Sequence, residues 1–252
     1  MNTLDKVVEM ANSKLGVLNK GFGRALVYSM MAGFFVGIGV GVMSVAGGIA
    51  HAGGSPYYKF FMAATFSVAL ALVLAAGADL FTGNNMVFTI AYLKKAVKGR
   101  DVLKMWGVSY LGNLLGSLLI SLLFIGSGIA SGTTGELMVS LAESKMNLPL
   151  GQMFFRAILC NILVCLAVWC YIKLQEESAK LMMVFLCIFT FVLMGFEHSV
   201  ANMTLLTTAN LIPHTAGVTL GGLLYNLSVV TIGNIIGGGL FVGAAYYYVL
   251  RD

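Results

Sequence analysis

Apolar residues occur along this chain in long runs, and short basic or polar segments separate the runs. A helix needs roughly 20 apolar residues to cross the hydrocarbon core of a bilayer. Six charge-poor runs reach about this length or exceed it. We therefore predict an all-α membrane protein with six spans, at about 25–50, 60–93, 102–128, 152–173, 180–210 and 220–249.

The segment before the first run has an amphipathic pattern. A helix over residues 1–20 places these apolar side chains on one face: Leu4, Val7, Val8, Ala11, Leu15 and Leu18. We expect this helix to lie at the membrane surface or against the bundle. The chain then divides into an N-terminal amphipathic cytoplasmic helix, 1–23, and a transmembrane domain, 24–252. The first run starts too late and is too long to be a signal peptide.

The composition agrees with a protein of several membrane spans, since 59% of the residues are hydrophobic, 10% are charged and the mean hydropathy is +0.91. Under six spans, 12 of the 15 Lys and Arg residues lie on one side, and the other three are Lys59, Lys145 and Arg156. Positively charged loops face the cytoplasm, so both termini are expected on the inner side of the cell membrane. The net charge of +5 therefore reflects topology, and no nucleic-acid partner is expected.

The two halves of the chain resemble each other in three places. The matched segments, in chain order, are "RAL" (24–26) with "RAI" (156–158), "GADLFTGNNM" (77–86) with "GFEHSVANMT" (195–204), and "YLGNLLGSLL" (110–119) with "TIGNIIGGGL" (231–240). Three spans per half is an odd number, so the halves must have opposite orientations. Such inverted repeats occur in many transporters and channels, with the site where interrupted helices meet.

Two of the runs are expected to be interrupted helices. The second run is too long for one straight crossing, and Asp79 and the segment "TGNN" (82–85) lie in its middle. We predict a break near 79–85, where Gly83 tolerates unusual backbone angles, and a second break near 197–203. Irregular backbone at this depth requires protein partners or a water-filled cavity.

Polar side chains at the breaks are candidates for holding them. The carboxylates of Asp79 and Glu197 are expected to accept hydrogen bonds from free N–H groups, as in an N-cap; a proton relay is the less favoured alternative. The amides of Asn85 and Asn202 are expected to tie the breaks down.

His198 lies at mid-membrane depth beside the second break. A lone histidine there is as often a structural hydrogen-bonding residue as a functional one. The N-terminal ends of half-helices carry partial positive charge and free N–H donors, which favours a site for a small anion. The spans supply no ring of acids for a cation path.

Further candidates each have a second interpretation. Lys145 could concentrate anions or be a solvated loop lysine, and Asn161 could line a passage or join helices. Six apolar residues are candidates for constrictions, although most such residues in a bundle are only packing: Phe66, Leu70, Leu80, Phe81, Val164 and Phe191. The four cysteines lie inside spans without Cys-x-x-Cys spacing, so we expect packing residues and neither a metal site nor a cofactor: Cys160, Cys165, Cys170 and Cys187.

Four segments together resemble the formate/nitrite transporter family, and within it the hydrosulfide channel branch. They are "ADLFTGN" (78–84), "WGVSYLGNLLGSL" (106–118), "RAILCNILVCLAVW" (156–169) and "GFEHSVANM" (195–203). The resemblance implies a homopentamer with a pore in each protomer and an aquaporin-like fold with broken second and fifth helices. It implies substrates that are small monovalent anions of weak acids: hydrosulfide as the first choice, formate and nitrite besides.

The resemblance also assigns roles to residues of this chain. It implies that His198, Thr82 and Asn161 line the pore, that Lys145 stands at the outer side, and that His198 hydrogen-bonds or protonates the anion between two constrictions. The inner constriction is implied at Leu70, Phe81 and Val164, and the outer one at Phe66, Leu80 and Phe191.

Two other classes of protein are alternatives to an anion transporter. A water or small-solute channel of the aquaporin type requires Asn-Pro-Ala motifs, but none of Pro56, Pro149 and Pro213 follows an asparagine. An intramembrane hydrolase is a remote alternative, because "EHSVAN" is not a His-Glu-x-x-His motif. We therefore do not expect an enzyme.

Overall fold

A computed structural model describes residues 2–213 and 215–251, and these residues form helices and short connections without a strand. The helices are α1 (Thr3–Asn19), α2 (Phe22–Ala52), α3 (Tyr58–Phe66), α4 (Val68–Leu72), a π-helical turn (Val73–Gly77), α5 (Phe81–Leu93), α6 (Gly99–Gly126), α7 (Gly132–Met146), α8 (Leu150–Lys173), α9 (Glu177–Leu193), α10 (Ser199–Leu211), α11 (Leu220–Ile236), a second π-helical segment (Gly237–Ala244) and α12 (Ala245–Leu250).

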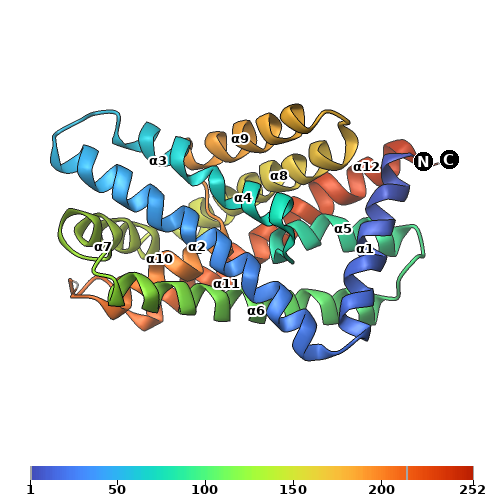
Figure 1. Cartoon of the computed structure of the whole chain (residues 1–252), viewed down its shortest axis with the longest axis horizontal. Coiled ribbons are helices and arrows are strands. Elements are labelled where there is room, and N and C mark those ends of the chain that lie inside the picture. Colours follow the sequence, from blue (N-terminus) through green and yellow to red (C-terminus); the bar gives the residue numbers. More distant parts are fainter. Residues whose placement is uncertain (1, 214, 252) are drawn as a thin grey trace.

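The helices run roughly along one axis, except α1, which crosses one end of the bundle (Figure 1). Within the described residues, five helical stretches are long and apolar enough to cross a membrane: Phe22–Ala52, Tyr58–Gly77, Gly99–Gly126, Leu150–Lys173 and Leu220–Leu250. The predicted all-α membrane protein is confirmed. The run predicted at 180–210 is built from α9 and α10, two helices that are each shorter than a full span.

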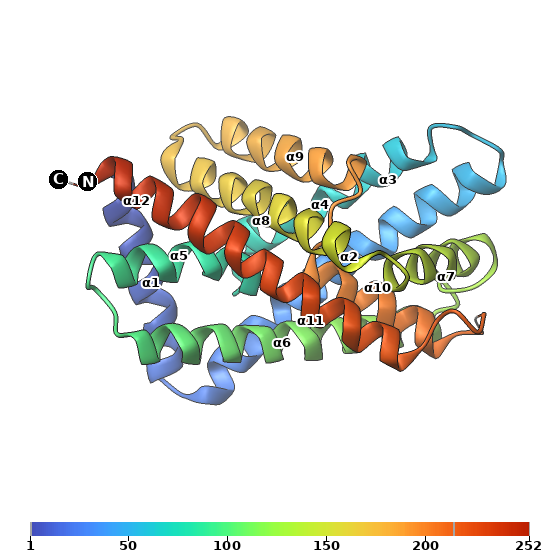
Figure 2. The same ribbon diagram turned by 180° about the vertical axis from the view of Figure 1, so that it is seen from behind.

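The short helices α5 and α10 lie inside the bundle, where long helices surround them (Figure 2). Ten of the 13 residues of α5 and nine of the 13 of α10 are buried. Pairs of long helices pack around them, α2 against α6 and α8 against α9 and α11. Small residues allow some of these contacts, since a Cβ on Gly33 of α2 would collide with the Asn113 carbonyl of α6.

The first break lies where the sequence predicts it but is shorter. Gly77 ends the π-helical turn with φ +83°, Ala78 to Leu80 are extended or loop residues, and α5 begins at Phe81. The expected irregular segment "TGNN" is therefore helical, and Gly77 rather than Gly83 adopts the left-handed conformation. The polar residues of this segment can be helical because the protein interior supplies partners for their side chains.

The second break is also shorter than predicted. Gly195 has φ +68°, and the chain is irregular as far as His198, the N-cap residue of α10. Residues 199–203, expected within the break, form the start of α10. In both halves the polar residues after the break thus belong to the first turns of a half-helix.

The N-terminal helix α1 is docked on the bundle. Its residues Leu4, Val7 and Ala11 are at most 1% exposed and pack in a cluster with residues of α5. At the surface, Lys94 Nζ lies 2.7 Å from Asp5 Oδ1, and the hydrogen bond from Lys94 lowers the pKa of the Asp5 carboxyl. Of the two expected positions, the helix takes the one against the bundle.

Candidate functional site

The N-terminal ends of α5 and α10 meet in the interior through Thr82 and His198. Thr82 Oγ1 lies 3.0 Å from His198 Nε2, and both residues are buried. On the other side of the ring, the Ala201 N–H donates to His198 Nδ1 at 3.1 Å. A neutral ring with Nδ1 as acceptor carries its proton on Nε2, which then donates to Thr82 Oγ1. The hydroxyl proton of Thr82 is left to serve another acceptor.

A small apolar chamber adjoins His198. Its lining consists of Val36, Phe66, Ala69, Leu70, Leu80, Val164, Ile188, Phe191 and His198. Its volume of about 10 Å³ has room for about one water molecule. The ring of Phe191 is stacked on that of His198 with centroids 5.8 Å apart and meets that of Phe66 edge to face. An ion that enters this space loses almost all of its water.

The chamber contains five of the six apolar residues proposed as constrictions. Phe81 is not part of its lining. The ring of Phe81 packs instead against Tyr110 of α6, with centroids 5.1 Å apart at an angle of 81°. As the first residue of α5, Phe81 directs its side chain toward α6, and the chamber is formed without it.

A larger cavity lies on each side of the chamber. One, of about 380 Å³, shares Phe66, Phe191 and His198 with the chamber and is also lined by Lys145 and Arg156. We call it the Lys145 vestibule. The other, of about 420 Å³, shares Leu70 and Leu80 with the chamber and is also lined by Lys14. We call it the Lys14 vestibule. The small apolar chamber thus lies between two larger cavities that each share lining residues with it.

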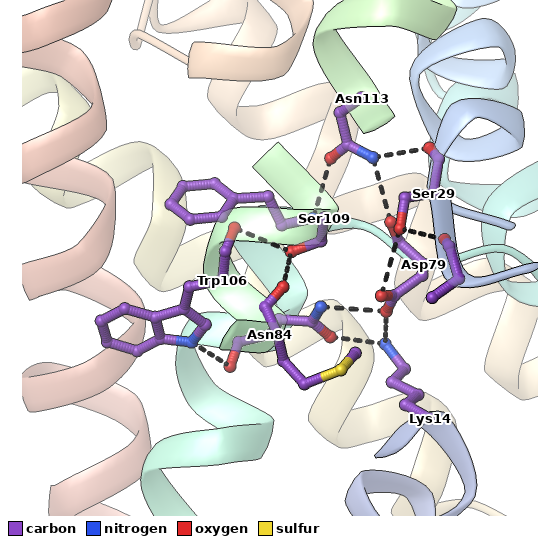
Figure 3. Close-up of polar contacts among 10 residues, drawn as sticks. Lys14, Ser29, Asp79, Asn84, Trp106, Ser109 and Asn113 are labelled. Carbon is purple, nitrogen blue, oxygen red and sulfur yellow. Dashed lines mark hydrogen bonds and ion pairs between the residues drawn. The ribbon is translucent and has the colours of Figure 1, made fainter. Parts of the chain in front are cut away.

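The first break is held by side chains from three other helices (Figure 3). Asp79 Oδ1 lies 2.9 Å from Lys14 Nζ of α1 and accepts a hydrogen bond from Asn84 Nδ2 at 2.9 Å. The backbone is held by Asn113, whose Oδ1 accepts from the Phe81 N–H at 2.9 Å. Its Nδ2 donates to the carbonyl oxygens of Ser29 and Asp79. The predicted N-cap role of Asp79 is therefore wrong, because Asn113 supplies the acceptor and the carboxylate is paired with a lysine.

The second break has the same arrangement. Glu197 Oε1 lies 2.7 Å from Lys145 Nζ, and Glu197 Oε2 accepts from Asn202 Nδ2 at 2.6 Å. Asn234 Oδ1 accepts from the Ser199 N–H, and Asn234 Nδ2 donates to the carbonyl oxygens of Ala157 and Glu197. Glu197 is thus also paired with a lysine and does not act as an N-cap.

These matching contacts revise two assignments made from the sequence, the role of Asn85 at the first break and the match of Arg24 with Arg156. Asn84, not Asn85, takes the place in the first break that Asn202 takes in the second. The backbone N–H of Asp79 donates to the carbonyl of Tyr28, and that of Glu197 donates to the carbonyl of Arg156. Arg156 therefore corresponds in its contacts to Tyr28 and not to Arg24.

Asn161 lies behind Thr82, outside the lining of the chamber and both vestibules. Its Nδ2 lies 3.1 Å from the Thr82 carbonyl oxygen, 3.0 Å from Asn85 Oδ1 and 2.6 Å from the Asn234 carbonyl oxygen. Asn161 thus ties the start of α5 to α11. Asn85 takes part in this tie rather than in the break.

Residues 1–248 match the family model for the formate/nitrite transporter. The chain belongs to the formate/nitrite transporter family. It is therefore an integral membrane transport protein and not an enzyme.

Several members of the formate/nitrite transporter family are similar to this chain over most of its length. The uncharacterized transporter YwcJ of Bacillus subtilis is 38% identical over 250 residues, which cover 99% of this chain and 98% of the relative. The nitrite transporter NirC of Salmonella typhimurium is 37% identical over 223 residues, which cover 88% of this chain and 81% of the relative.

Solved structures of the formate/nitrite transporter family have the same fold. An FNT family ion channel superposes with a TM-score of 0.93 at 34% identity, covering 99% of both chains. A pentameric formate channel with formate bound superposes with a TM-score of 0.82 at 29% identity, covering 92% of this chain and 99% of that one.

Sequence reasoning missed several residues of this formate/nitrite transporter site. Lys14, Asn84, Asn113, Asn226 and Asn234 all hold the breaks. The repeated Gly-Asn pair of the third and sixth runs contains Asn113 and Asn234, and it was the available signal. Its role could not be assigned, because the backbone groups it serves lie elsewhere in the chain.

Proposed function

We propose that this protein carries small monovalent anions of weak acids across the cell membrane. The observation that supports this most is the Thr82–His198 pair beside a dry chamber, between two vestibules that each contain a lysine. The substrates named for relatives, nitrite and formate, have this chemistry. Hydrosulfide is a third anion of the same kind, and we propose it as the preferred one.

The apolar chamber favours anions that can be neutralised. A bare charge in such a space is costly, whereas a neutral acid of the same size crosses it easily. The two half-helix N-termini direct partial positive charge toward the same region, and the Thr82 hydroxyl has a proton to donate. An anion is therefore drawn to the end of the chamber and crosses as the neutral acid.

His198 is proposed to act by hydrogen bonding rather than by lending a proton. A second proton on its ring would have to occupy Nδ1, which accepts from the Ala201 N–H. Protonation would therefore break the N-cap of α10 in a buried place. The proton that neutralises the substrate comes from water in a vestibule.

The assembly and orientation are also proposals. Exposed apolar side chains, among them Leu111, Leu118, Leu119 and Leu122 of α6, leave a large face for lipid or for other protomers. By likeness to the pentameric formate channel we propose a homopentamer with one passage in each protomer. The distribution of Lys and Arg supports both termini, and so the Lys14 vestibule, on the cytoplasmic side of the inner membrane.

Reconstituted protein tests the substrate class. Proteoliposomes are expected to conduct formate, nitrite and hydrosulfide, with hydrosulfide fastest. They should conduct chloride poorly, because chloride is the anion of a strong acid and is not neutralised near neutral pH. Stopped-flow measurements of internal pH and anion content compare the four anions, with empty liposomes as control. Chloride flux equal to formate flux contradicts the weak-acid mechanism, and water as the sole permeant supports the aquaporin-type alternative.

Replacement of His198 by asparagine separates hydrogen bonding from proton lending. Asparagine is a good N-cap residue and can still accept from the Ala201 N–H. We expect formate flux to fall about tenfold, because the hydrogen bond between residue 198 and Thr82 Oγ1 is lost. The shape of the pH profile of the flux should stay the same. Proteoliposome fluxes between about pH 5 and about pH 8 measure both quantities. Thr82→Val should reproduce the loss; a flattened pH profile in His198→Asn alone would indicate proton lending.

A further inference from the structure

The lining of the Lys145 vestibule carries more positive than negative charge. Among the described residues its lining includes the cations Lys59, Lys145 and Arg156, and Glu197 is the one acid. Lys145 is bound to Glu197 at 2.7 Å, so these two charges compensate each other. The charges of Arg156 and of the exposed Lys59 remain.

Arg156 differs from Lys59 in being held at the break. Its carbonyl oxygen accepts from the Glu197 N–H at 3.3 Å, in the first turns of α8. Its side chain is half-buried in the vestibule lining, and no described residue forms an ion pair or a hydrogen bond with its guanidinium group. A guanidinium in a partly buried cavity without a protein acceptor is suited to an anionic ligand.

The two vestibules are unequal at this position. The residue with the matching backbone contact in the first half is Tyr28, which lines the Lys14 vestibule. The counterparts Lys14 and Lys145 are each paired with an acid. The lining of the Lys14 vestibule also includes Lys6 and Glu9, whose opposite charges balance, whereas the described lining of the Lys145 vestibule has no acid that balances Arg156.

We propose that Arg156 forms an anion-binding subsite in the Lys145 vestibule, which takes a monovalent oxyanion of carboxylate or sulfonate type before it reaches the chamber. The guanidinium presents parallel N–H donors that match two oxygens of one such group. The role of the subsite in transport rests on the proposed function; binding of the anion does not.

Methanesulfonate is a suitable probe, because it stays charged at all accessible pH values and so cannot cross the chamber as a neutral acid. We expect it to compete with formate for uptake into right-side-out vesicles of cells that express the full chain. Arg156→Gln should raise its inhibition constant about fivefold, as expected for loss of one charge at close range in a partly screened site. Arg156→Lys should stay within about twofold of the wild type, and high salt should reduce the difference.

Arg24→Gln is the matched control, because Arg24 is exposed at the start of α2 and lies outside both vestibule linings. It should leave inhibition unchanged. An unchanged inhibition constant in Arg156→Gln, or no inhibition of the wild type, overturns the proposal. If the wild type carries no formate, the proposed function fails, and calorimetric binding of methanesulfonate to wild type and Arg156→Gln in nanodiscs still decides whether the subsite exists.

Discussion

Replacement of Asn234 by leucine is expected to lower the free energy of unfolding by about 3–6 kcal/mol, since three buried backbone groups lose their partner at about 1–2 kcal/mol each. These are the N–H of Ser199 and the carbonyls of Ala157 and Glu197. Water cannot replace the amide, because Asn234 is fully buried in a segment that spans the membrane. The second break should open, and the purified variant should aggregate at a lower temperature.

Thermal stability in mild detergent, followed by size-exclusion chromatography, measures this loss. Asn210→Leu is the matched control, because the Asn210 amide donates to Leu206 of its own helix and holds no break. It should change stability little. Equal melting of Asn234→Leu and Asn210→Leu would show that the break is held by packing instead.

Replacement of Lys145 by methionine should be nearly as damaging, by about 3–5 kcal/mol, because it leaves a buried carboxylate without its partner. Glu197 is 2% exposed, and its other side-chain contact is the Asn202 amide. We expect lower stability and formate flux reduced to near background. The double variant Lys145→Met with Glu197→Gln should recover much of the stability, because the unpaired charge is removed.

A double-mutant cycle on purified protein provides the measurement. The exposed pair of Lys94 and Asp5 is the comparison, and Lys94→Met should have little effect there, since solvent screens an exposed ion pair. A double variant that is less stable than Lys145→Met alone would contradict the account, because the carboxylate would then not be the source of the damage.

The helical architecture could be predicted from the sequence because it depends on the lipid bilayer that surrounds the chain. A bilayer requires every backbone group to be paired within the segment, so runs of apolar residues become helices. The positions of the breaks were also visible, since Asp79 and Glu197 interrupt apolar runs. Their extent was not, because polarity alone does not reveal that Thr82–Asn85 can be helical when side chains from α1 and α8 serve them.

The roles of the side chains at the breaks show a second limit of prediction from the sequence. A carboxylate beside a helix start is a reasonable N-cap, yet Asn113 and Asn234 take that role. Lys14 could not be connected with Asp79 from the sequence, because 64 intervening residues separate them and only the docking of α1 brings them to 2.9 Å. Phe81 is a similar case, since its ring packs against Tyr110 and is not part of the chamber lining.

The sequence by itself determined the membrane-embedded helical class, the two interrupted segments and the importance of the region around His198, because each follows from local polarity against an apolar background. The partners of the polar groups, the tautomer that the Ala201 N–H imposes on His198, and the unpaired state of Arg156 were decided by the tertiary structure. The reason is physical: a polar atom buried in the bilayer takes whichever donor or acceptor the packing of distant helices brings within about 3 Å.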